Sequence, residues 1–216
     1  MRIEIWSDVI CPWCYIGKRR LEAALSNFAQ RDSVQVVWRS FELDPNAPRQ
    51  RPGTLEEMLA QKYRVSPQQA AAMNARVTAI AREAGLEYRL ANARPGNTFD
   101  AHRLLHFADS KRLGDRAAER IMRAYFSESL PVGERAALAR LAPEFGIAES
   151  EALAVLESDT WSADVRADEA RAAALGVSGV PFFLFDGKTA ITGAQPVEAF
   201  AEALQRAWGN SSPIKG

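Results

Sequence analysis

The two cysteines of this 216-residue chain, Cys11 and Cys14, stand three positions apart, and the sequence contains no others. They follow a short strand-like run and begin a helix-like one, with Pro12 and Trp13 between them. Residues three apart on a helix share a face, so the two sulfurs can close a disulfide or open to a dithiol. A helix start favours a thiolate, and Pro12 suits the first turn because its missing N–H costs nothing there. The spacing therefore predicts a redox-active cysteine pair.

Metal binding is a second chemistry open to the same cysteines. The two histidines of the chain, His102 and His106, lie four positions apart on a predicted helix, a spacing at which two imidazoles can share a metal ion. Two cysteines and two histidines would complete a tetrahedral zinc site. The two pairs are far apart in sequence, so we favour the redox pair. Zinc binding, or a non-enzymatic adaptor role, is kept as an alternative.

The charge balance and hydropathy narrow the range of partners. The 27 Lys and Arg residues balance 27 Asp and Glu residues, so we expect neither nucleic acid nor an anionic membrane as a partner. No apolar run approaches the ~18 residues of a membrane span, and no signal peptide is recognisable, so we expect a cytoplasmic protein. In the cytosol, an isolated Cys-x-x-Cys pair is catalytic or metal-binding more often than structural.

The elements that must position the cysteines are predicted from the pattern of apolar residues. Strands are expected at 3–9, 34–41, 180–185 and 188–192, and helices at 12–29 and 196–208. The Asp-Gly pair at 186–187 predicts a hairpin between the last two strands. The middle of the chain is Ala-, Arg- and Glu-rich with helical periodicity, and Thr54 and Ser66 have the sequence of helix N-caps. Helices are expected there at 54–62, 66–84, 98–110, 114–127, 134–145, 149–156 and 160–175.

This order of elements predicts an α/β domain that is split by a helical insertion. Residues 1–44 and 176–210 are assigned to the α/β domain, and residues 54–175 to the insertion. The first strand–helix–strand unit alone has too few strands to be stable, which favours one split domain over two separate ones. The Pro-rich stretch 45–52 is expected to be a linker, and residues 209–216 a frayed tail.

Three segments carry a resemblance to a known family. They are residues 7–17 around the cysteines, 97–104 in the helical segment and 176–183 before the last hairpin. Together they resemble the thioredoxin superfamily, specifically its DsbA-like members, and most closely the FrnE-like branch of predicted dithiol–disulfide isomerases. The resemblance spans nearly the whole chain. It implies a thioredoxin-like α/β fold interrupted by an all-helical insertion domain.

The resemblance also implies roles for individual residues. Cys11 matches the exposed nucleophile and Cys14 the more buried resolving thiol. Pro181 matches the family's cis-proline beside the disulfide, a position that would leave the Val180 backbone free to pair with a substrate strand. The implied activity is thiol–disulfide exchange on protein substrates or small thiols. It needs no cofactor beyond the protein's own disulfide, with glutathione as a candidate co-substrate, and a monomer or homodimer serves equally.

Further residues are expected to contact the substrate or the redox site. Pro12 and Trp13 lie between the sulfurs, and Trp13 is expected to be exposed on an apolar peptide-docking surface. From the insertion, His102 and Asn97 are candidates to face the redox site, although a packed or capping role is an alternative for His102. Asp8 is either a buried carboxylate that relays the proton of Cys14 or a surface residue at the end of the first strand.

Glutathione-dependent enzymes form the main rival class. Kappa-class glutathione transferases and 2-hydroxychromene-2-carboxylate isomerases resemble this architecture. They have Ser where Cys11 stands and no cysteine at the position of Cys14. They also carry a Ser-Asp pair near the last helix, where this chain has Gly-Ala-Gln at 193–195. Both departures favour the disulfide oxidoreductase interpretation.

Overall fold

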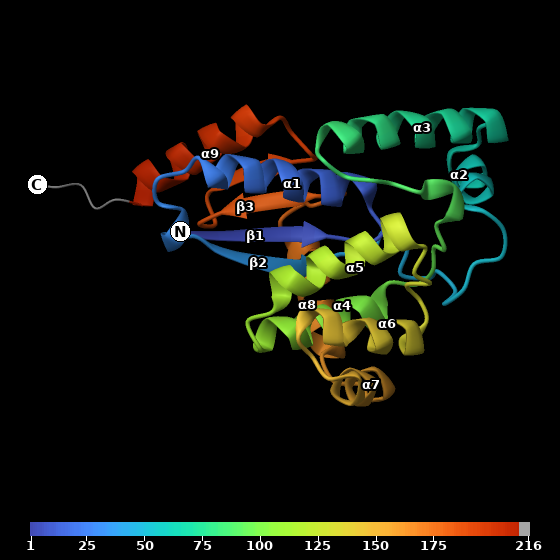
Figure 1. The fold of residues 1–216 in the computed structure, drawn as a ribbon. Coiled ribbons are helices and arrows are strands. Elements are labelled where there is room, and N and C mark those ends of the chain that lie inside the picture. Colours follow the sequence, from blue (N-terminus) through green and yellow to red (C-terminus); the bar gives the residue numbers. More distant parts are fainter. Residues whose placement is uncertain (212–216) are drawn as a thin grey trace, which may run out of the picture.

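The computed structural model describes residues 1–211 and is built around a four-stranded mixed sheet (Figure 1). The strand order is β2-β1-β3-β4. β1 is parallel to β2 and antiparallel to β3, and β3 and β4 form the predicted hairpin. The bounds are Arg2–Ser7 for β1, Gln35–Ser40 for β2, Phe182–Phe185 for β3 and Thr189–Thr192 for β4.

Helices cover both faces of the sheet, which explains why β1 is buried along most of its length. On one face lie α1 (Pro12–Ser26) and α9 (Val197–Ser211), which pack on each other, and α9 also contacts β3 and β4. On the other face, three helices pack on β2, namely α8 (Ser162–Ala174), α4 (Phe99–Ser110) and α5 (Gly114–Glu128). The four predicted strands and two flanking helices are therefore present, and the α/β class is confirmed.

The chain between β2 and β3 contains helices and no strand within the described residues. One predicted helix, 134–145, is wrong as a single element, because it is divided into α6 and a 3₁₀ turn at 142–145. Pro143 lies in that turn and has no N–H to continue an α-helical hydrogen-bond ladder. The helices before α8 are α2 (Leu55–Tyr63), α3 (Pro67–Glu83), α4 (Phe99–Ser110), α5 (Gly114–Glu128), α6 (Arg135–Leu141) and α7 (Glu149–Glu157).

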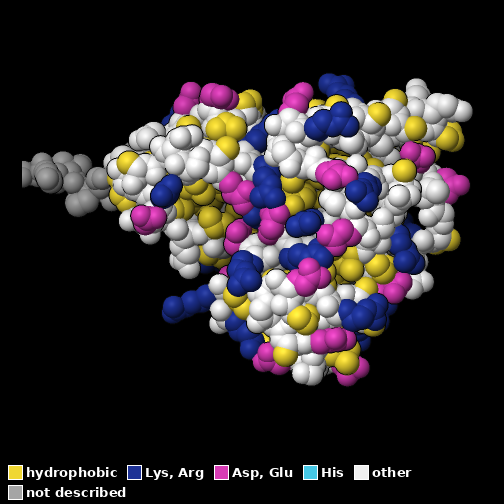
Figure 2. Space-filling model, viewed as in Figure 1, with side chains coloured by type: hydrophobic (Ala, Val, Ile, Leu, Met, Phe, Trp, Pro, Cys, Tyr) yellow, Lys and Arg dark blue, Asp and Glu magenta, His cyan; other side chains and the backbone are white. Residues whose placement is uncertain are grey.

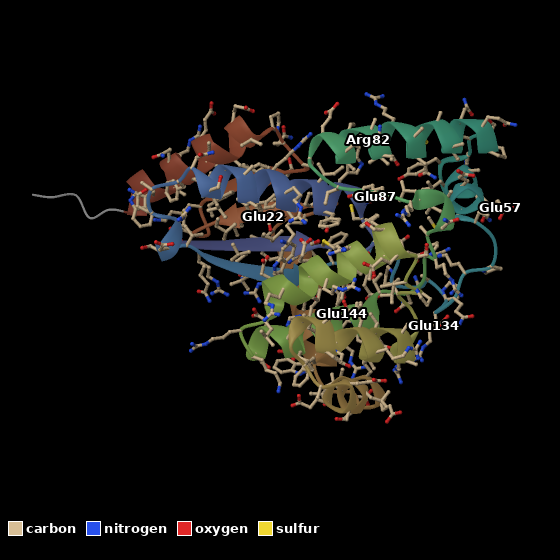
Figure 3. All side chains as sticks on the ribbon, viewed as in Figure 1. Glu22, Glu57, Arg82, Glu87, Glu134 and Glu144 are labelled. Atoms are coloured by element: carbon tan, nitrogen blue, oxygen red, sulfur yellow. The ribbon has the colours of Figure 1, made fainter. Side chains whose placement is uncertain are left out.

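Both predicted N-caps form complete capping boxes. The Thr54 hydroxyl accepts from the Glu57 amide at 3.1 Å, and the Glu57 carboxylate accepts from the Thr54 amide at 2.8 Å. Glu57 lies in the first turn of α2 (Figure 3). Ser66 and Gln69 make the same reciprocal pair at the start of α3. Each box stabilises its helix by about 1 kcal/mol, and the signal is local enough to be read from sequence.

The linker is held by backbone contacts rather than free. The carbonyl oxygen of Arg49 lies against the α-carbons of Gly96 and Gly133, so closely that a side chain at either glycine would collide with it. The Asn97 amide also donates to the Pro48 carbonyl at 3.0 Å. The segment predicted as a linker is therefore fixed against the helical insertion.

The apolar core runs without interruption from the sheet into the helical segment. A second, smaller cluster joins Trp6 of β1 and Leu184 of β3 to Ala172 of α8 and to Val177. The helical segment thus shares its core with the sheet. The residue boundaries assigned to the two domains stay a prediction.

Some element ends differ from the prediction. β1 ends at Ser7 because the chain turns there, with the Cys11 amide donating to the Asp8 carbonyl at 3.0 Å. The first helix ends at Ser26, three residues early, and the second strand spans 35–40. The tail expected from residue 209 is wrong in part, since α9 continues to Ser211; residues 212–216 lie outside the described residues. No helix in the described chain is long and apolar enough to cross a membrane.

Candidate active site

The turn between β1 and α1 places both cysteines at the start of the helix. Cys11 is the N-cap of α1 with an extended backbone, and Pro12 is the first helical residue. The Cys14 and Tyr15 amides donate to the Cys11 carbonyl at 3.0 and 3.4 Å. Both cysteines are free thiols. Cys14 is 1% exposed and Cys11 is 4% exposed, so the exposed position expected of Cys11 is wrong, although Cys11 is the less buried of the two. The helix-start geometry on which the redox prediction depends is therefore present.

A cis peptide bond between Val180 and Pro181 lies beside the first sulfur. The Cys11 Sγ is 3.7 Å from the Val180 carbonyl oxygen. The helix backbone approaches the same loop closely at Gly17, where an added Cβ would lie 3.1 Å from the Pro181 ring and 3.0 Å from Phe183. The cis bond expected from the resemblance is present and adjoins Cys11. The catalytic role of Pro181 stays a prediction.

The dipeptide between the cysteines has one half-buried residue, Pro12, and one exposed residue, Trp13. Trp13 is 41% exposed, as expected of a residue that could meet a substrate. The Pro12 carbonyl accepts a hydrogen bond from the Tyr88 hydroxyl at 2.8 Å. Tyr88 in turn stacks on Phe126 and Tyr15. The helical insertion therefore supports the motif from behind with aromatic rings, while leaving Trp13 accessible.

The two thiols have different surroundings. Burial raises the pKa of Cys14 well above its usual value, and the nearby Cys11 sulfur raises it further. The Ser7 hydroxyl and the Asp8 backbone amide face the Cys14 sulfur and act in the opposite direction, because both can donate to a thiolate. Cys14 is therefore a thiol near neutral pH and must lose a proton before it can attack a disulfide.

Asp8 is the buried carboxylate of the two alternatives left open by the sequence. Its side chain is fully buried, and its Oδ2 accepts from the Leu43 amide at 2.8 Å. Its Oδ1 is 3.6 Å from Nε2 of His102. His102 is 1% exposed and projects from α4 in the insertion. The structure thus brings His102 to the inner side of the redox site, through Asp8.

Asn97 lies at the junction of the linker and α4. Its Oδ1 accepts from the Phe99 amide at 3.0 Å, which caps the start of α4. Its amide nitrogen donates to the Glu42 carboxylate at 3.4 Å and to the Pro45 carbonyl at 3.3 Å. These contacts tie the linker to α4, and the predicted role of Asn97 in substrate binding stays a prediction.

The four residues of the zinc alternative do not come together. His106 Nε2 contacts the Ser40 hydroxyl at 3.1 Å and the Asp168 carboxylate at 3.2 Å, and its ring stacks on Trp161. Across residues 1–211, no cluster of three or more His, Cys, Asp or Glu side chains could hold a metal ion. The two histidines, one helical turn apart, therefore contact different carboxylates, His102 that of Asp8 and His106 that of Asp168.

The comparison with protein families decides the classification. The DSBA-like thioredoxin domain family matches residues 2–205. The chain belongs to this family. Membership confirms the resemblance to DsbA-like thioredoxin proteins and the thioredoxin-like fold with a helical insertion, while the FrnE-like branch stays a prediction.

Solved structures extend this DSBA-like assignment. A probable DsbA oxidoreductase from Streptomyces coelicolor is 43% identical, with a TM-score of 0.94 over 100% of this chain and 93% of its own. The cytosolic disulfide reductase DsbM from Pseudomonas aeruginosa is 19% identical, with a TM-score of 0.66 over 98% of this chain and 100% of its own. A 2-hydroxychromene-2-carboxylate isomerase is 13% identical, with a TM-score of 0.73 and full coverage of both chains. The last two likenesses concern the fold alone.

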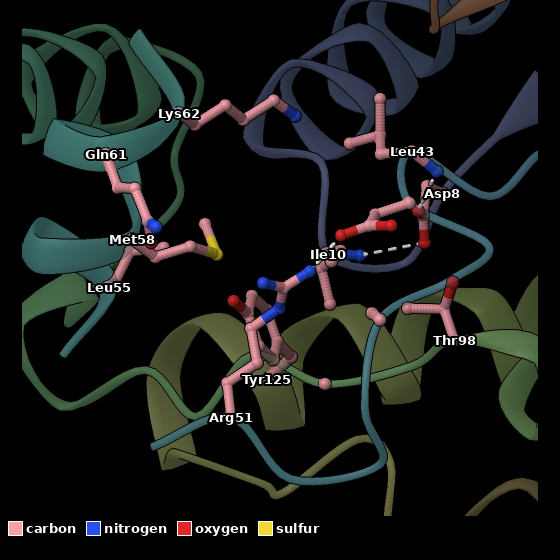
Figure 4. Close-up of a pocket in the computed structure, with 13 residues that line it drawn as sticks. Asp8, Ile10, Leu43, Arg51, Leu55, Met58, Gln61, Lys62, Thr98 and Tyr125 are labelled. Atoms are coloured by element: carbon pink, nitrogen blue, oxygen red, sulfur yellow. Dashed lines mark hydrogen bonds and ion pairs between the residues drawn. The ribbon is translucent and has the colours of Figure 1, made fainter. Parts of the chain in front are cut away.

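A cavity of about 420 cubic ångströms adjoins the site of this DSBA-like protein on the side of α2 (Figure 4). Asp8 and Ile10, just before Cys11, form one wall, and Leu55 and Met58 of α2 form another. The Lys62 side chain reaches towards the space between them. Sequence analysis missed this cavity, although the spacing of Leu55 and Met58 on one helix face was a signal that α2 covers something apolar.

A group of charged residues between α1 and α5 was also missed. Lys18 is 3% exposed and contacts Glu119 at 3.1 Å, Asp115 at 3.5 Å and Glu22. Arg19 pairs with the same Glu119, which also accepts from the Tyr15 hydroxyl at 2.6 Å. Figure 2 shows basic and acidic side chains interleaved on this face, and Glu22 belongs to this junction (Figure 3). The group fixes the first turns of α1, and hence the cysteines, against the insertion.

Proposed function

We propose that this DSBA-like protein is a thiol–disulfide oxidoreductase or isomerase that acts on protein or small-molecule disulfides. Cys11 is the nucleophile and Cys14 the resolving thiol. The observation that carries the proposal is the pairing of a dithiol at a helix start with the Val180 carbonyl, 3.7 Å from the first sulfur. An extended substrate can pair with the backbone of that loop while its disulfide meets Cys11.

The reaction follows from the different surroundings of the two thiols. The Cys11 thiolate attacks one sulfur of a substrate disulfide, forming a mixed disulfide and releasing the other sulfur as a thiolate. Cys14 then loses its proton and attacks Cys11, which breaks the bond to the substrate and closes the Cys11–Cys14 disulfide. The substrate gains two electrons and the cysteine pair loses two. The reverse sequence oxidises a substrate dithiol.

Glutathione is the small thiol that we propose as a co-substrate, in a cytoplasmic setting. A glutathione-bound structure exists for the cytosolic disulfide reductase DsbM, which shares the fold. In this chain glutathione would reduce the Cys11–Cys14 disulfide after each cycle. We propose glutathione as a reactant rather than a bound cofactor. The glutathione-dependent families carry a Ser-Asp pair near the last helix, and this chain has Gly-Ala-Gln at 193–195 instead.

Trapping of the intermediate tests this function. The Cys14→Ser variant, mixed with glutathione disulfide, is expected to accumulate a one-to-one mixed disulfide on Cys11, seen by mass spectrometry. The wild type should instead form an internal disulfide that glutathione buffers open and close reversibly, with a midpoint between about −270 and −120 mV. Cys11→Ser is the matched control, and should form neither species because burial raises the pKa of the remaining Cys14 thiol well above its usual value. Absence of a reversible internal disulfide in the wild type at every buffer ratio would refute the proposal.

A further inference from the structure

A small polar cavity lies between the end of β1 and α4, on the inner side of the cysteines. Ser7 lines it from β1 and His102 from α4, together with Ser40 and His106. Its volume is about 10 cubic ångströms, close to the smallest space that holds one water molecule. The cavity is thus distinct from the larger one beside α2.

Two buried polar atoms at this cavity have no hydrogen-bond partner among the described protein groups. They are the Ser7 hydroxyl oxygen and Nε2 of His102. Such an atom costs about 1 to 3 kcal/mol when it is left unpaired, so two of them at one cavity require a reason. By contrast, the Ser40 and His106 side chains at the same cavity bond to each other at 3.1 Å. The unpaired atoms are those on the Cys14 and Asp8 side.

We propose that Ser7, His102 and Asp8 form a buried proton relay that serves Cys14, with one water molecule in the cavity joining the Ser7 hydroxyl to the His102 imidazole. The proposal rests on the proposed function, because it concerns the step in which Cys14 resolves a mixed disulfide. His102 and Asp8 are positioning and proton-accepting residues in this step. They do not touch the substrate.

Each member of the relay has the chemistry that its place requires. The Ser7 hydroxyl faces the Cys14 sulfur and can accept one proton while donating another. The His102 imidazole can accept that proton. A buried imidazolium is costly without a nearby negative charge, and the Asp8 carboxylate, 3.6 Å from Nε2, supplies one. The Glu42 carboxylate is also close enough to His102 for a positive charge on the imidazole to favour the ionised form of Glu42.

His102 and Asp8 are surrounded by titratable groups from several elements. Glu42 follows β2 and is bound by Arg166 of α8. Tyr125 of α5 faces Asp8, and burial together with that carboxylate raises the pKa of the phenol. Other titratable groups near the relay are Asp44, Arg51 and Lys62 at the larger cavity, Cys11 at the N-cap of α1 and Cys14 within it, and His106 with its partner Asp168.

Resolution of the mixed disulfide moves one proton from Cys14 to His102. The Cys14 thiol gives its proton to Ser7 Oγ, whose own proton passes through the water to His102 Nε2. The Cys14 thiolate forms a bond to Cys11 Sγ, and the bond between Cys11 and the substrate sulfur breaks. The substrate leaves as a thiolate and takes a proton from solvent. The cysteine pair is oxidised by two electrons and the substrate reduced. In the reverse direction the imidazolium returns the proton to Cys14.

The reaction with 5,5′-dithiobis(2-nitrobenzoate) separates the two steps. Attack by Cys11 releases a first coloured thiolate, and resolution by Cys14 releases a second, and stopped-flow absorbance follows both. In the wild type the second release should be fast at neutral pH, because an internal base takes the Cys14 proton. In His102→Gln it should slow by about 10²-fold and become steeply faster with rising pH, because solvent hydroxide must replace the base. The first release should be unchanged.

Asp8→Asn should slow the second release in the same direction, since asparagine keeps the bond to the Leu43 amide but loses the charge. Ser7→Ala provides a test with minimal structural change if His102→Gln fails to fold, as judged by thermal unfolding. His106→Gln is the matched control, because this histidine lies one turn along α4 and has its own partners. It should leave both phases unchanged.

The outcomes separate the relay from the function beneath it. If the wild type gives no second release, the proposed oxidoreductase function fails. If the wild type gives both releases but folded Ser7, Asp8 and His102 variants keep its second phase at every pH, the relay is refuted. If His106→Gln slows the second phase as much as His102→Gln, the effect is a general result of disturbing α4, and the relay is also refuted.

Discussion

The two sides of the cysteine pair are built in different ways. On the side of Cys11, the neighbours are backbone groups and apolar side chains, chiefly the Val180–Pro181 loop and the exposed Trp13. On the side of Cys14, the neighbours are buried polar groups, and His102 comes from a helix nearly ninety positions away. The insertion therefore contributes His102 to the inner side of the reaction centre and does more than cover it.

The inner side depends on ion pairs that attach the insertion to the sheet. Asp168 of α8 accepts from Arg39 of β2 at 2.9 Å and from the Ser40 amide at 3.0 Å. It also contacts His106 of α4. Asp168 is therefore the point at which two helices of the insertion meet the edge strand β2.

Asp168→Asn should give the largest loss of stability of the three changes that test this comparison. Asparagine is isosteric but removes the charge that pairs with Arg39 and His106, so we expect about 2 to 3 kcal/mol of destabilisation at pH 7. Urea unfolding measures it. If the variant and the wild type have the same free energy of unfolding, the polar attachment of the insertion to β2 contributes little to stability.

The same pair predicts a pH dependence. Burial opposes ionisation of Asp168, but hydrogen bonds from His106 and Ser40 and the charge of Arg39 outweigh it and hold its pKa below the usual value. A lowered pKa in the folded state stabilises the protein above the unfolded-state pKa of about 3.9, and this stabilisation is lost as pH falls through the folded value. The stability difference between wild type and Asp168→Asn should be constant near neutral pH and shrink below about pH 4.

Gly17→Val tests the outer side of the pair, the side of Cys11. It should lower the free energy of unfolding by a smaller amount, about 2 kcal/mol. Its Cβ would press on Pro181 and Phe183, and the two methyl groups add to the overpacking, partly offset by the better helix propensity of valine. Gly179→Val is the matched control, because no atom lies within 4 Å of its Cβ position and its φ is not left-handed. Equal urea midpoints for the two variants would contradict the close approach of α1 to the loop.

Trp13→Ala should change stability least, by less than about 0.5 kcal/mol, because the side chain is largely exposed. Its effect should appear in substrate choice. We expect slower reaction with an apolar peptide disulfide and an unchanged rate with glutathione disulfide, compared in the same stopped-flow assay. A uniform slowing with both substrates would show that Trp13 acts on the cysteines rather than on the substrate.

The outer side could be predicted from sequence because its signals are local. The cysteine spacing, the Val-Pro pair before a hairpin and the capping residues at Thr54 and Ser66 each depend on a few neighbouring residues. Helix periodicity is equally local, which is why the predicted and observed helix bounds differ by few residues outside the break at Pro143. Capping and period fix an element without reference to the rest of the chain.

The inner side could not be predicted in the same way. The burial of Asp8 and its approach to His102 depend on the angle at which α4 packs on the sheet, which no local pattern encodes. Asn97 illustrates the ambiguity, because an amide near the start of a helix serves equally as a cap or as a ligand, and local sequence does not show that its Oδ1 accepts from the Phe99 amide. The contacts of Arg49 with Gly96 and Gly133 were missed because they join three segments through backbone atoms.

The buried Lys18 has a consequence for how this protein can change over generations. One ammonium group serves acidic side chains on both α1 and α5, namely Glu22, Asp115 and Glu119. Loss of the lysine alone would leave these acids facing one another, and loss of an acid would remove part of what keeps the lysine charged in a buried place. Substitutions at positions 18, 22, 115 and 119 are therefore expected to occur together in evolution. The sequence of α5 in the insertion would then change in step with that of α1, the helix that begins at the cysteines.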